Sequence, residues 1–371
     1  MALKKIGLAA ALLATTMLGT GAPALADGTV KVGVLQSLSG TMAISEVPLQ
    51  NAELLAIAQL NAKGGVLGQK LVLNIGDDAC DPKQAVSVAN DFASKKVVFV
   101  AGHFCSSSSI PASKVYADEG ILQITPASTN PKFTDEGSWN TFRTCGRDDQ
   151  QGAVAGAYIA KEYKGQKVAI LHDNSAYGKG LADETKKALN KAGMTEALYS
   201  AYTPGEKDYS AIVSRLKQAG VNLIYIGGYQ TEIGLIKRQA TQQGLNATVM
   251  GGDALVTSEY WQITGDTGEG TLMTFPSDPR IRPTAAAVVK EFKDKGIDPE
   301  GYVLYTYAAV QVWAEAAAKA GTTDPKKVAA MLKSGGPWDS VLGKIGYDKK
   351  GDILDSDYTM YIWHKGSYAQ M

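Results

Sequence analysis

The sequence predicts an α/β protein whose chain forms two doubly wound parallel sheets. Short apolar segments alternate with segments of helical spacing at intervals of roughly 25 residues, as expected for strands joined by crossover helices. A length of 371 residues favours two domains over a single core. The alternating series starts again after residues 142–148, so we expect a second sheet to follow the first.

Four strands and three helices are predicted for the first sheet. The strands are expected at 29–35, 70–75, 97–101 and 121–124. The helices between them are expected at 48–62, 81–95 and 110–120. Each helix has a proline in its predicted first turn, where the missing N–H removes no hydrogen bond.

The second series repeats this pattern and ends in a helical block. Its helices are expected at 150–163, 179–192, 208–219 and 231–243, and its strands at 167–171, 196–202, 222–226, 248–250 and 270–275. Helices at 285–295, 302–320 and 326–333 follow without strands between them. Two last strands, 343–347 and 358–363, are predicted to be joined by a turn at 348–351.

A helical block after the second sheet indicates that the chain returns to the first lobe near Pro276. With a final return, three crossings would join the lobes through a hinge. We therefore expect lobe 1 at 27–147 plus 277–357, and lobe 2 at 148–276 plus 358–371. A cleft between two hinged lobes is the geometry of a closing trap.

The first 26 residues have the pattern of a secretory signal peptide. Lys4 and Lys5 precede an apolar run at 6–18, and Ala24-Leu25-Ala26 provides a small-residue cleavage site. Cleavage after Ala26 leaves 35 basic residues of the original 37 against 37 acidic ones, a net charge near −2. The charges are mixed along the chain, which argues against a nucleic-acid surface. The sequence predicts an exported, periplasmic protein.

Export favours disulfides, and three cysteines remain after cleavage: Cys80, Cys105 and Cys145. Three pairings are open. Cys80 and Cys105 each follow the carboxyl end of a predicted strand, and those strands should be neighbours. This placement favours a Cys80–Cys105 bridge, with Cys145 as a buried thiol.

No catalytic constellation is found in the sequence. None of His103, His172 and His364 has metal-ligand spacing around it. His103 beside Cys105 could indicate a thiol nucleophile, but a disulfide at Cys105 is favoured. The segment 177–180 has part of a dinucleotide fingerprint, but Asp183 stands where the third glycine would be. We therefore expect a binding protein rather than an enzyme, with no cofactor and no metal.

Two Ser/Thr-rich loops should meet at one edge of the first sheet. The loop 102–109 contains Ser106 and its three following serines, and the loop 125–129 contains Ala127, Ser128 and Thr129. Ligands of open α/β sheets bind at the carboxyl edge of the strands. Hydroxyls and free N–H groups at a helix start suit an anion such as a carboxylate, although a serine there can also be a simple cap.

The second lobe provides complementary groups at its own strand ends. Asp253 follows a predicted strand and could meet an ammonium group held opposite the serine loop. Tyr177 and Tyr229 also follow strands, and Tyr302 begins a helix; each could equally be core or rim. A zwitterion bound across a cleft would need this division, with donors in one lobe and an acid in the other.

At these residues the chain resembles the periplasmic leucine/isoleucine/valine-binding proteins, the type I solute-binding proteins of branched-chain amino acid ABC transporters. The most specific stretches are 77–86, Asp-Asp-Ala-Cys-Asp-Pro-Lys-Gln-Ala-Val, and 102–108, Gly-His-Phe-Cys-Ser-Ser-Ser. Further matches lie at 118–122, 172–173, 177–178, 205–208, 225–229 and 346–348. The resemblance covers essentially the whole mature chain and implies the periplasmic binding protein type I fold.

The resemblance also implies roles for individual residues. Ser106 and Thr129 would hold the α-carboxylate of an amino acid, and the Ala127 carbonyl would accept from its ammonium. Asp253 stands where the family has an acidic partner for the ammonium, usually glutamate. The remaining site residues would line the ligand or adjoin it: Ser128, Tyr229, Phe104, Cys105, Tyr177, Tyr302 and Ser45. The Cys80–Cys105 pair matches the family disulfide.

One loop departs from the family pattern. The segment 39–46 lacks the aromatic residue that family members often place near Ser45, and it is similar to the loop of urea- and short-amide-binding relatives. We therefore expect a monomeric substrate-binding component of an ABC importer that captures a branched-chain or other aliphatic amino acid for its permease subunits. The alternatives are a binder of urea, short amides or aromatic carboxylates, an exported enzyme, and a receptor-type sensor domain.

Overall fold

The computed structural model describes residues 28–371, so the predicted signal peptide, 1–26, lies outside the described residues. The first sheet has five parallel strands in the order β2-β1-β3-β4-β5. Their bounds are β1 (Thr29–Gln36), β2 (Lys70–Asp77), β3 (Phe99–Ala101), β4 (Leu122–Thr125) and β5 (Thr141–Arg143).

Helices cover both faces of this sheet because its side chains alternate between two apolar cores. Val32 and Val34 of β1 belong to the core cluster that contains α1 and α11, whereas Leu35 packs with α2 and α3. The helices are α1 (Ala43–Ala62), α2 (Pro82–Ser94), α3 (Ser106–Asp118), α4 (Lys132–Asp135), α11 (Val303–Ala320) and α12 (Pro325–Ser334). Asp81 caps α2 by accepting from the Gln84 N–H at 2.8 Å.

The second sheet has seven strands in the order β14-β13-β10-β9-β8-β6-β7. Its parallel strands are β6 (Val168–His172), β7 (Leu198–Ala201), β8 (Leu223–Gly227), β9 (Thr248–Gly251) and β10 (Leu272–Pro276). Two antiparallel strands, β13 (Tyr358–His364) and β14 (Ser367–Gln370), complete the edge beside β10. The two sheets and their covering helices confirm the predicted α/β architecture.

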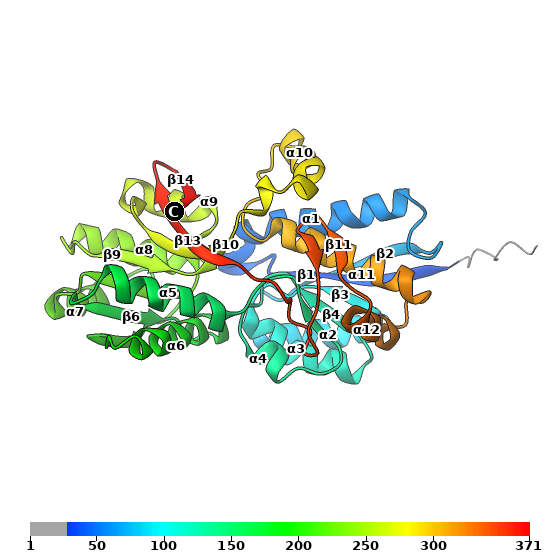
Figure 1. Ribbon diagram of the computed structural model, residues 1–371, viewed down its shortest axis with the longest axis horizontal. Helices are drawn as coiled ribbons and strands as arrows, with labels where there is room; N and C mark the ends of the chain where they lie inside the picture. Colours follow the sequence, from blue (N-terminus) through cyan, green and yellow to red (C-terminus); the bar gives the residue numbers. More distant parts are fainter. Residues whose placement is uncertain (1–27) are drawn as a thin grey trace, which may run out of the picture.

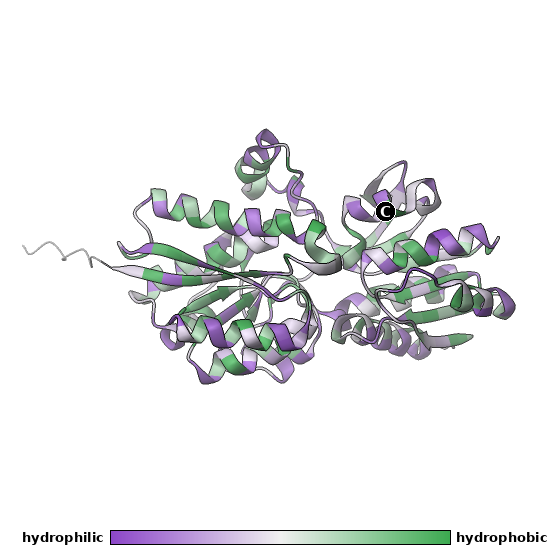
Figure 2. Ribbon diagram, turned by 180° about the vertical axis from the view of Figure 1, so that it is seen from behind, coloured by the Kyte–Doolittle hydropathy of each residue, from purple (hydrophilic) through white to green (hydrophobic). Residues whose placement is uncertain are grey.

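Further helices surround the second sheet. They are α5 (Asp148–Glu162), α6 (Ala176–Lys191), α7 (Ser210–Ala219), α8 (Gln230–Gln242) and α9 (Ser258–Thr264). Helix α10 (Ala286–Asp294) comes after β10 and lies beside α1 of the first lobe, where Glu291 accepts from Gln59 Nε2 at 2.7 Å. Figure 2 shows apolar residues concentrated in the strands, whereas the helices alternate apolar and polar residues. Within residues 28–371, none of the helices is both long enough and apolar enough to span a bilayer.

The two sheets lie in two halves of an elongated molecule (Figure 1). We call the half built on the five-stranded sheet the first lobe and the other half the second lobe. The chain passes between them three times: from β5 to α5, after β10, and from β12 (Gly343–Ile345) to β13. The residue limits of the lobes given above stay a prediction.

Several predicted elements differ from the structure. Helix α3 begins at Ser106 rather than near residue 110, and α1 begins at Ala43 rather than at Pro48. Pro48 and Pro111 therefore lie in the second turn of their helices, where each removes one backbone hydrogen bond without ending the helix. Proline is common in the first turn of a helix, so a first-turn proline gave helix starts that are too late, and the residues just before each proline were predicted as loops.

The predicted pairing of strands 343–347 and 358–363 is wrong. Strand β12 pairs with β11 (Trp338–Ser340) in a small separate sheet, and β13 pairs with β10 and β14 of the second lobe. Residues 346–357 between them form the third crossing, and the predicted turn at 348–351 lies within it, closed by an antiparallel bridge between Tyr347 and Ile353. Two short strands that follow each other in sequence have the pattern of a hairpin even when each of them pairs with a different strand.

Candidate ligand-binding site

A small cavity lies between the lobes at the carboxyl ends of both sheets. It is lined by residues of the first lobe and of the second lobe: Phe104, Ser106, Ala127, Tyr177, Tyr229, Asp253 and Ala254. All but Ala254 were predicted as site residues from the sequence. Because the first lobe provides the ends of β3 and β4, and the second lobe the ends of β6, β8 and β9, the cavity lies at the edge where ligands of such sheets bind.

Asp253 is the central acidic group of this cavity. Its Oδ1 accepts from the Tyr177 hydroxyl at 2.7 Å and from Gln151 Nε2 at 2.7 Å, and its Oδ2 accepts from the Tyr302 hydroxyl at 2.6 Å. Burial raises the pKa of Asp253, and these hydrogen bonds, led by that of Tyr302, act in the opposite direction. Tyr177 and Tyr302 thus orient the carboxyl group as well as wall the pocket.

Gln151 was not predicted from the sequence. It lies in α5, and its amide bridges Asp253 and Asp148, which is 3.3 Å from Gln151 Nε2. Burial and the nearby Asp253 charge raise the pKa of Asp148. A glutamine within a helix gives no signal of such a role, because only the packing of α5 against the second sheet brings it to the site.

The serine loop of the first lobe forms the opposite wall. Ser106 is the first residue of α3, and its Oγ accepts from the Asn130 N–H at 3.3 Å. Cys105 caps this 13-residue helix without a side-chain hydrogen bond, and among the described residues the N–H groups of Ser106 and Ser107 have no hydrogen-bond partner. The positive end of the helix dipole therefore lies at Ser106, which lines the cavity. This combination is well suited to a carboxylate.

The other loop residues have different environments. The Ser128 hydroxyl lies 2.8 Å from the Phe104 carbonyl and 2.7 Å from Ser109 Oγ, so it joins the two loops and does not line the cavity. Thr129 Oγ1 is buried and approaches the Asp148 carboxyl without meeting hydrogen-bond geometry. Among residues 28–371, the hydrogen bonds of this loop leave the Ala127 carbonyl without a partner.

Aromatic rings enclose the space beside Asp253. Tyr177 and Tyr229 have ring centroids 5.1 Å apart, and Phe104 meets Tyr302 edge-to-face at 6.0 Å. A second, larger pocket borders Phe104, Asp253 and Tyr302 and continues along Met42 and Ile44. Ser45 lies in the first turn of α1, and its side chain is outside the described part of the structure.

The Cys80–Cys105 disulfide is confirmed, with the two Cα atoms 5.5 Å apart. It ties the loop after β2 to the start of α3, and it excludes Cys105 as a free nucleophile. Cys145 is a buried free thiol, as predicted, and burial raises its pKa to about 12. A thiol with such a pKa is poorly reactive.

His103 is engaged on both sides of its ring. Its Nδ1 lies 2.6 Å from Asp78 Oδ2 and its Nε2 lies 3.0 Å from the Tyr116 hydroxyl, all within the buried interior of the first lobe. His172 is the last residue of β6 rather than a loop residue, and it accepts from the Asn174 N–H at 3.3 Å. Within residues 28–371, no group of three or more His, Cys, Asp or Glu side chains could hold a metal ion.

Comparisons with known proteins agree with the two-lobed fold. A family model described as "Periplasmic binding protein" matches residues 29–367. "Leu/Ile/Val-binding protein homolog 1" of Brucella suis is 51% identical over 94% of this chain and 93% of that protein. "Leucine-, isoleucine-, valine-, threonine-, and alanine-binding protein" of Pseudomonas aeruginosa is 44% identical over 95% of this chain and 94% of that protein. The crystal structure of a leucine binding protein from Thermotoga maritima has a TM-score of 0.85 and 26% identity, and it covers 92% of this chain and 98% of that chain.

Proposed function

The chain belongs to the periplasmic binding protein family, and from this premise we propose that it captures an aliphatic amino acid between its lobes and presents it to the permease of an ABC importer. Leucine, isoleucine and valine are the first candidates, because relatives with about half of their residues identical bear those names. The observation that supports an amino acid most directly is the cavity with Asp253 on one wall and the start of α3 on the other.

The proposed ligand places its two charges on opposite walls. Its α-carboxylate receives hydrogen bonds from Ser106, Thr129 and the free N–H groups of α3. Its ammonium donates to the Ala127 carbonyl and to Asp253. A carboxylate offers about four acceptor sites, and three side-chain donors already occupy Asp253, so one position remains for the ammonium.

The proposal includes no bond making. The family consists of substrate-binding transport proteins, and the sulfur and imidazole groups beside the cavity are held in a disulfide and in a buried pair with Asp78. We also propose that the chain is exported, that its signal peptide is cleaved after Ala26, and that the mature protein is a monomer in the periplasm. Closure over the ligand then gives the form that the permease recognises.

The first test is a thermal-shift screen of the mature protein, stripped of ligand by unfolding and refolding. The panel contains leucine, isoleucine, valine, alanine and threonine, with urea, acetamide and benzoate for the alternative classes. A ligand raises the melting temperature by mass action. We expect a rise with leucine, isoleucine or valine; a rise only with compounds that lack an ammonium group would contradict the proposal.

The ammonium role of Asp253 is tested by Asp253→Ala. Loss of a charged hydrogen bond in a closed cleft should weaken leucine binding by about 1–3 kcal/mol, or roughly five- to 150-fold. Calorimetry with 4-methylpentanoate, which is leucine without its amino group, should show little change. Asp173→Asn is the matched control, because Asp173 is 4% exposed and Asp253 is 5% exposed, yet Asp173 does not line the cavity.

A further inference from the structure

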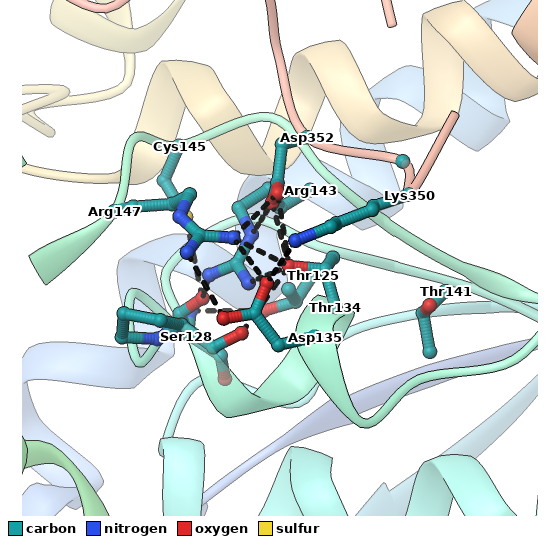
Figure 3. A network of polar contacts seen from close by, with 12 residues as sticks. Thr125, Ser128, Thr134, Asp135, Thr141, Arg143, Cys145, Arg147, Lys350 and Asp352 are labelled. Carbon is teal, nitrogen blue, oxygen red and sulfur yellow. Dashed lines mark hydrogen bonds and ion pairs between the residues drawn. The ribbon is translucent and has the colours of Figure 1, made fainter. Parts of the chain in front are cut away.

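Residues 126–130, which we call the ligand loop, lie against the buried side chain of Arg143. None of the proposed ligand contacts involves Arg143. It is the last residue of β5 and its side chain has no exposed surface. Its Nη1 donates to the Ser128 carbonyl at 2.5 Å and its Nη2 donates to the Asn130 carbonyl at 3.2 Å (Figure 3). One planar guanidinium therefore holds the two carbonyls on either side of Thr129.

The residues that follow Arg143 hold the rest of this loop. The Thr144 N–H donates to the Thr125 carbonyl at 3.0 Å, and the Asp148 N–H donates to the Thr129 carbonyl at 2.9 Å. Segment 143–148 thus fixes the carbonyls of Thr125, Ser128, Thr129 and Asn130. The Ala127 carbonyl, which is proposed to meet the ligand, is left free by the same arrangement.

Asp352, which lies on the third crossing between the lobes, is the counter-ion of the buried Arg143 guanidinium. Its Oδ1 forms an ion pair with Arg143 Nε at 2.7 Å, and its Oδ2 accepts from Arg147 Nη1 at 2.7 Å. Arg147, on the first crossing, also pairs with Asp149 at the start of α5, at 3.0 Å. Figure 3 shows Arg143, Arg147 and Lys350 converging on Asp352 and Asp135. The ligand loop and two of the three crossings therefore share one polar network.

We propose that Arg143 and Asp352 are positioning residues that set the geometry of the ligand loop 126–130 and couple it to the hinge. A buried ion pair is weak evidence for stability alone, because apolar residues of similar volume often serve as well. Here the guanidinium fork of Arg143 matches two loop carbonyls, and its counter-ion Asp352 comes from a hinge segment. Movement of the third crossing during closure is thereby transmitted to the carbonyl of Ala127 and to Thr129.

The experiment compares Asp352→Asn with a matched control, Glu196→Gln. Glu196 is 8% exposed, as is Asp352, and pairs with Lys186 at 2.5 Å, remote from the cleft. The first measurement is hydrogen exchange of the amides of residues 127–130 without ligand. We expect at least a tenfold faster exchange in Asp352→Asn and wild-type exchange in Glu196→Gln, even where both variants melt at lower temperature.

The second measurement is leucine affinity by calorimetry, and only this arm depends on the proposed function. We expect about a tenfold loss for Asp352→Asn, partial recovery in Asp352→Glu, and no change for Glu196→Gln. If the wild type does not bind leucine, isoleucine or valine, the proposed function is wrong. The hydrogen exchange of residues 127–130 then still tests whether Asp352 positions the loop.

An apolar double variant separates positioning from the cost of an unpaired buried charge. Arg143→Met with Asp352→Leu removes both charges, so this variant also serves if Asp352→Asn does not fold. We expect it to fold and to show the same fast exchange at 127–130, because the loop carbonyls have lost their donors. Wild-type exchange and wild-type leucine affinity in a folded Asp352→Asn or in the double variant would overturn the inference.

Discussion

Asp173 is an acid whose charge is costly in the folded state. It follows β6 and is almost fully buried, and its Oδ1 accepts from the Ser175 N–H at 2.8 Å. Burial raises its pKa to about 6, and the Ser175 hydrogen bonds only partly oppose this shift. Because the folded pKa lies above the unfolded value of about 3.9, the folded protein binds more protons between those two values. The contribution of Asp173 to stability is full below pH 4 and is lost as the pH rises through 6.

We predict that the change in the free energy of unfolding caused by Asp173→Asn is more favourable at pH 8 than at pH 4. The asparagine keeps an oxygen for Ser175 but carries no charge, so the difference between the two pH values should be about 3 kcal/mol at most. Urea unfolding of both proteins at pH 4, 6 and 8 measures it. A difference that is the same at all three pH values would show that Asp173 is not the titrating group.

Individual residues differ in how far the sequence could reveal them. Ser106, Ala127 and Asp253 were found because they follow apolar strands, and parallel strands end at one edge of a sheet. Gln151 and Arg143 could not be found in this way. Each acts through a partner more than a hundred residues distant or in a neighbouring loop, and the residues beside it in the sequence give no sign of that contact.

At the scale of elements, the loop after β2 is held in an unusual conformation. Ala79 and Cys80 both have positive φ, at 49° and 58°, which side chains rarely adopt. The Asp78 carboxylate fixes this turn by accepting from the Cys80 N–H at 2.8 Å and from Ser37 Oγ at 2.6 Å. The Cys80–Cys105 bridge then joins the turn to the start of α3, which holds Ser106.

We predict that loss of this disulfide lowers the free energy of unfolding by roughly 2–4 kcal/mol, because the unfolded chain regains the freedom of the loop it closes. Denaturant unfolding of the wild type with and without reductant measures the change. Cys80→Ala with Cys105→Ala should be less stable and insensitive to reductant, whereas Cys145→Ala should respond to reductant like the wild type. A wild type equally stable in both conditions would contradict the prediction.

The elements that were missed are short or lack an apolar pattern. Strand β5 has three residues and ends in the buried Arg143, and α9 has seven residues. Strand β14 is mostly exposed, so only its pairing with β13 defines it. The long helices and the parallel strands were found because burial on one or both faces leaves a regular apolar pattern in the sequence.

At the scale of the whole molecule, the two lobes repeat one topology. The order β2-β1-β3-β4-β5 of the first sheet recurs in the second as β7-β6-β8-β9-β10. In each sheet the strand order reverses between the first strand and the third, which is where ligands bind in such folds. Phe104 and Ser106 follow β3, and Tyr177 and Tyr229 follow β6 and β8, so the cavity lies between two facing switch points.

Direct hydrogen bonds also join the lobes across the rim of this cavity. Ser107 Oγ accepts from the Ala176 N–H at 3.1 Å, and Asn130 Nδ2 donates to the Ala176 carbonyl at 2.5 Å. Both link the first lobe to the first residue of α6. They should form as the lobes close, so their free energy adds to the apparent affinity for the ligand even though Ser107 does not line the cavity.

We predict that Ser107→Ala weakens leucine binding by about fivefold, since a hydrogen bond contributes roughly 1 kcal/mol net. The unliganded variant should melt near the wild-type temperature, because the lost contact belongs to the closed form. Calorimetry gives the affinity, and small-angle X-ray scattering at sub-saturating leucine should show a larger open fraction. Ser113→Ala is the control, because Ser113 lies on the same helix and its hydroxyl donates to the Ile110 carbonyl of that helix at 2.9 Å rather than to the second lobe. Equal affinities for the two variants would mean that closure does not depend on this contact, and that the ligand's own bridging of Asp253 and Ser106 is sufficient to hold the lobes together.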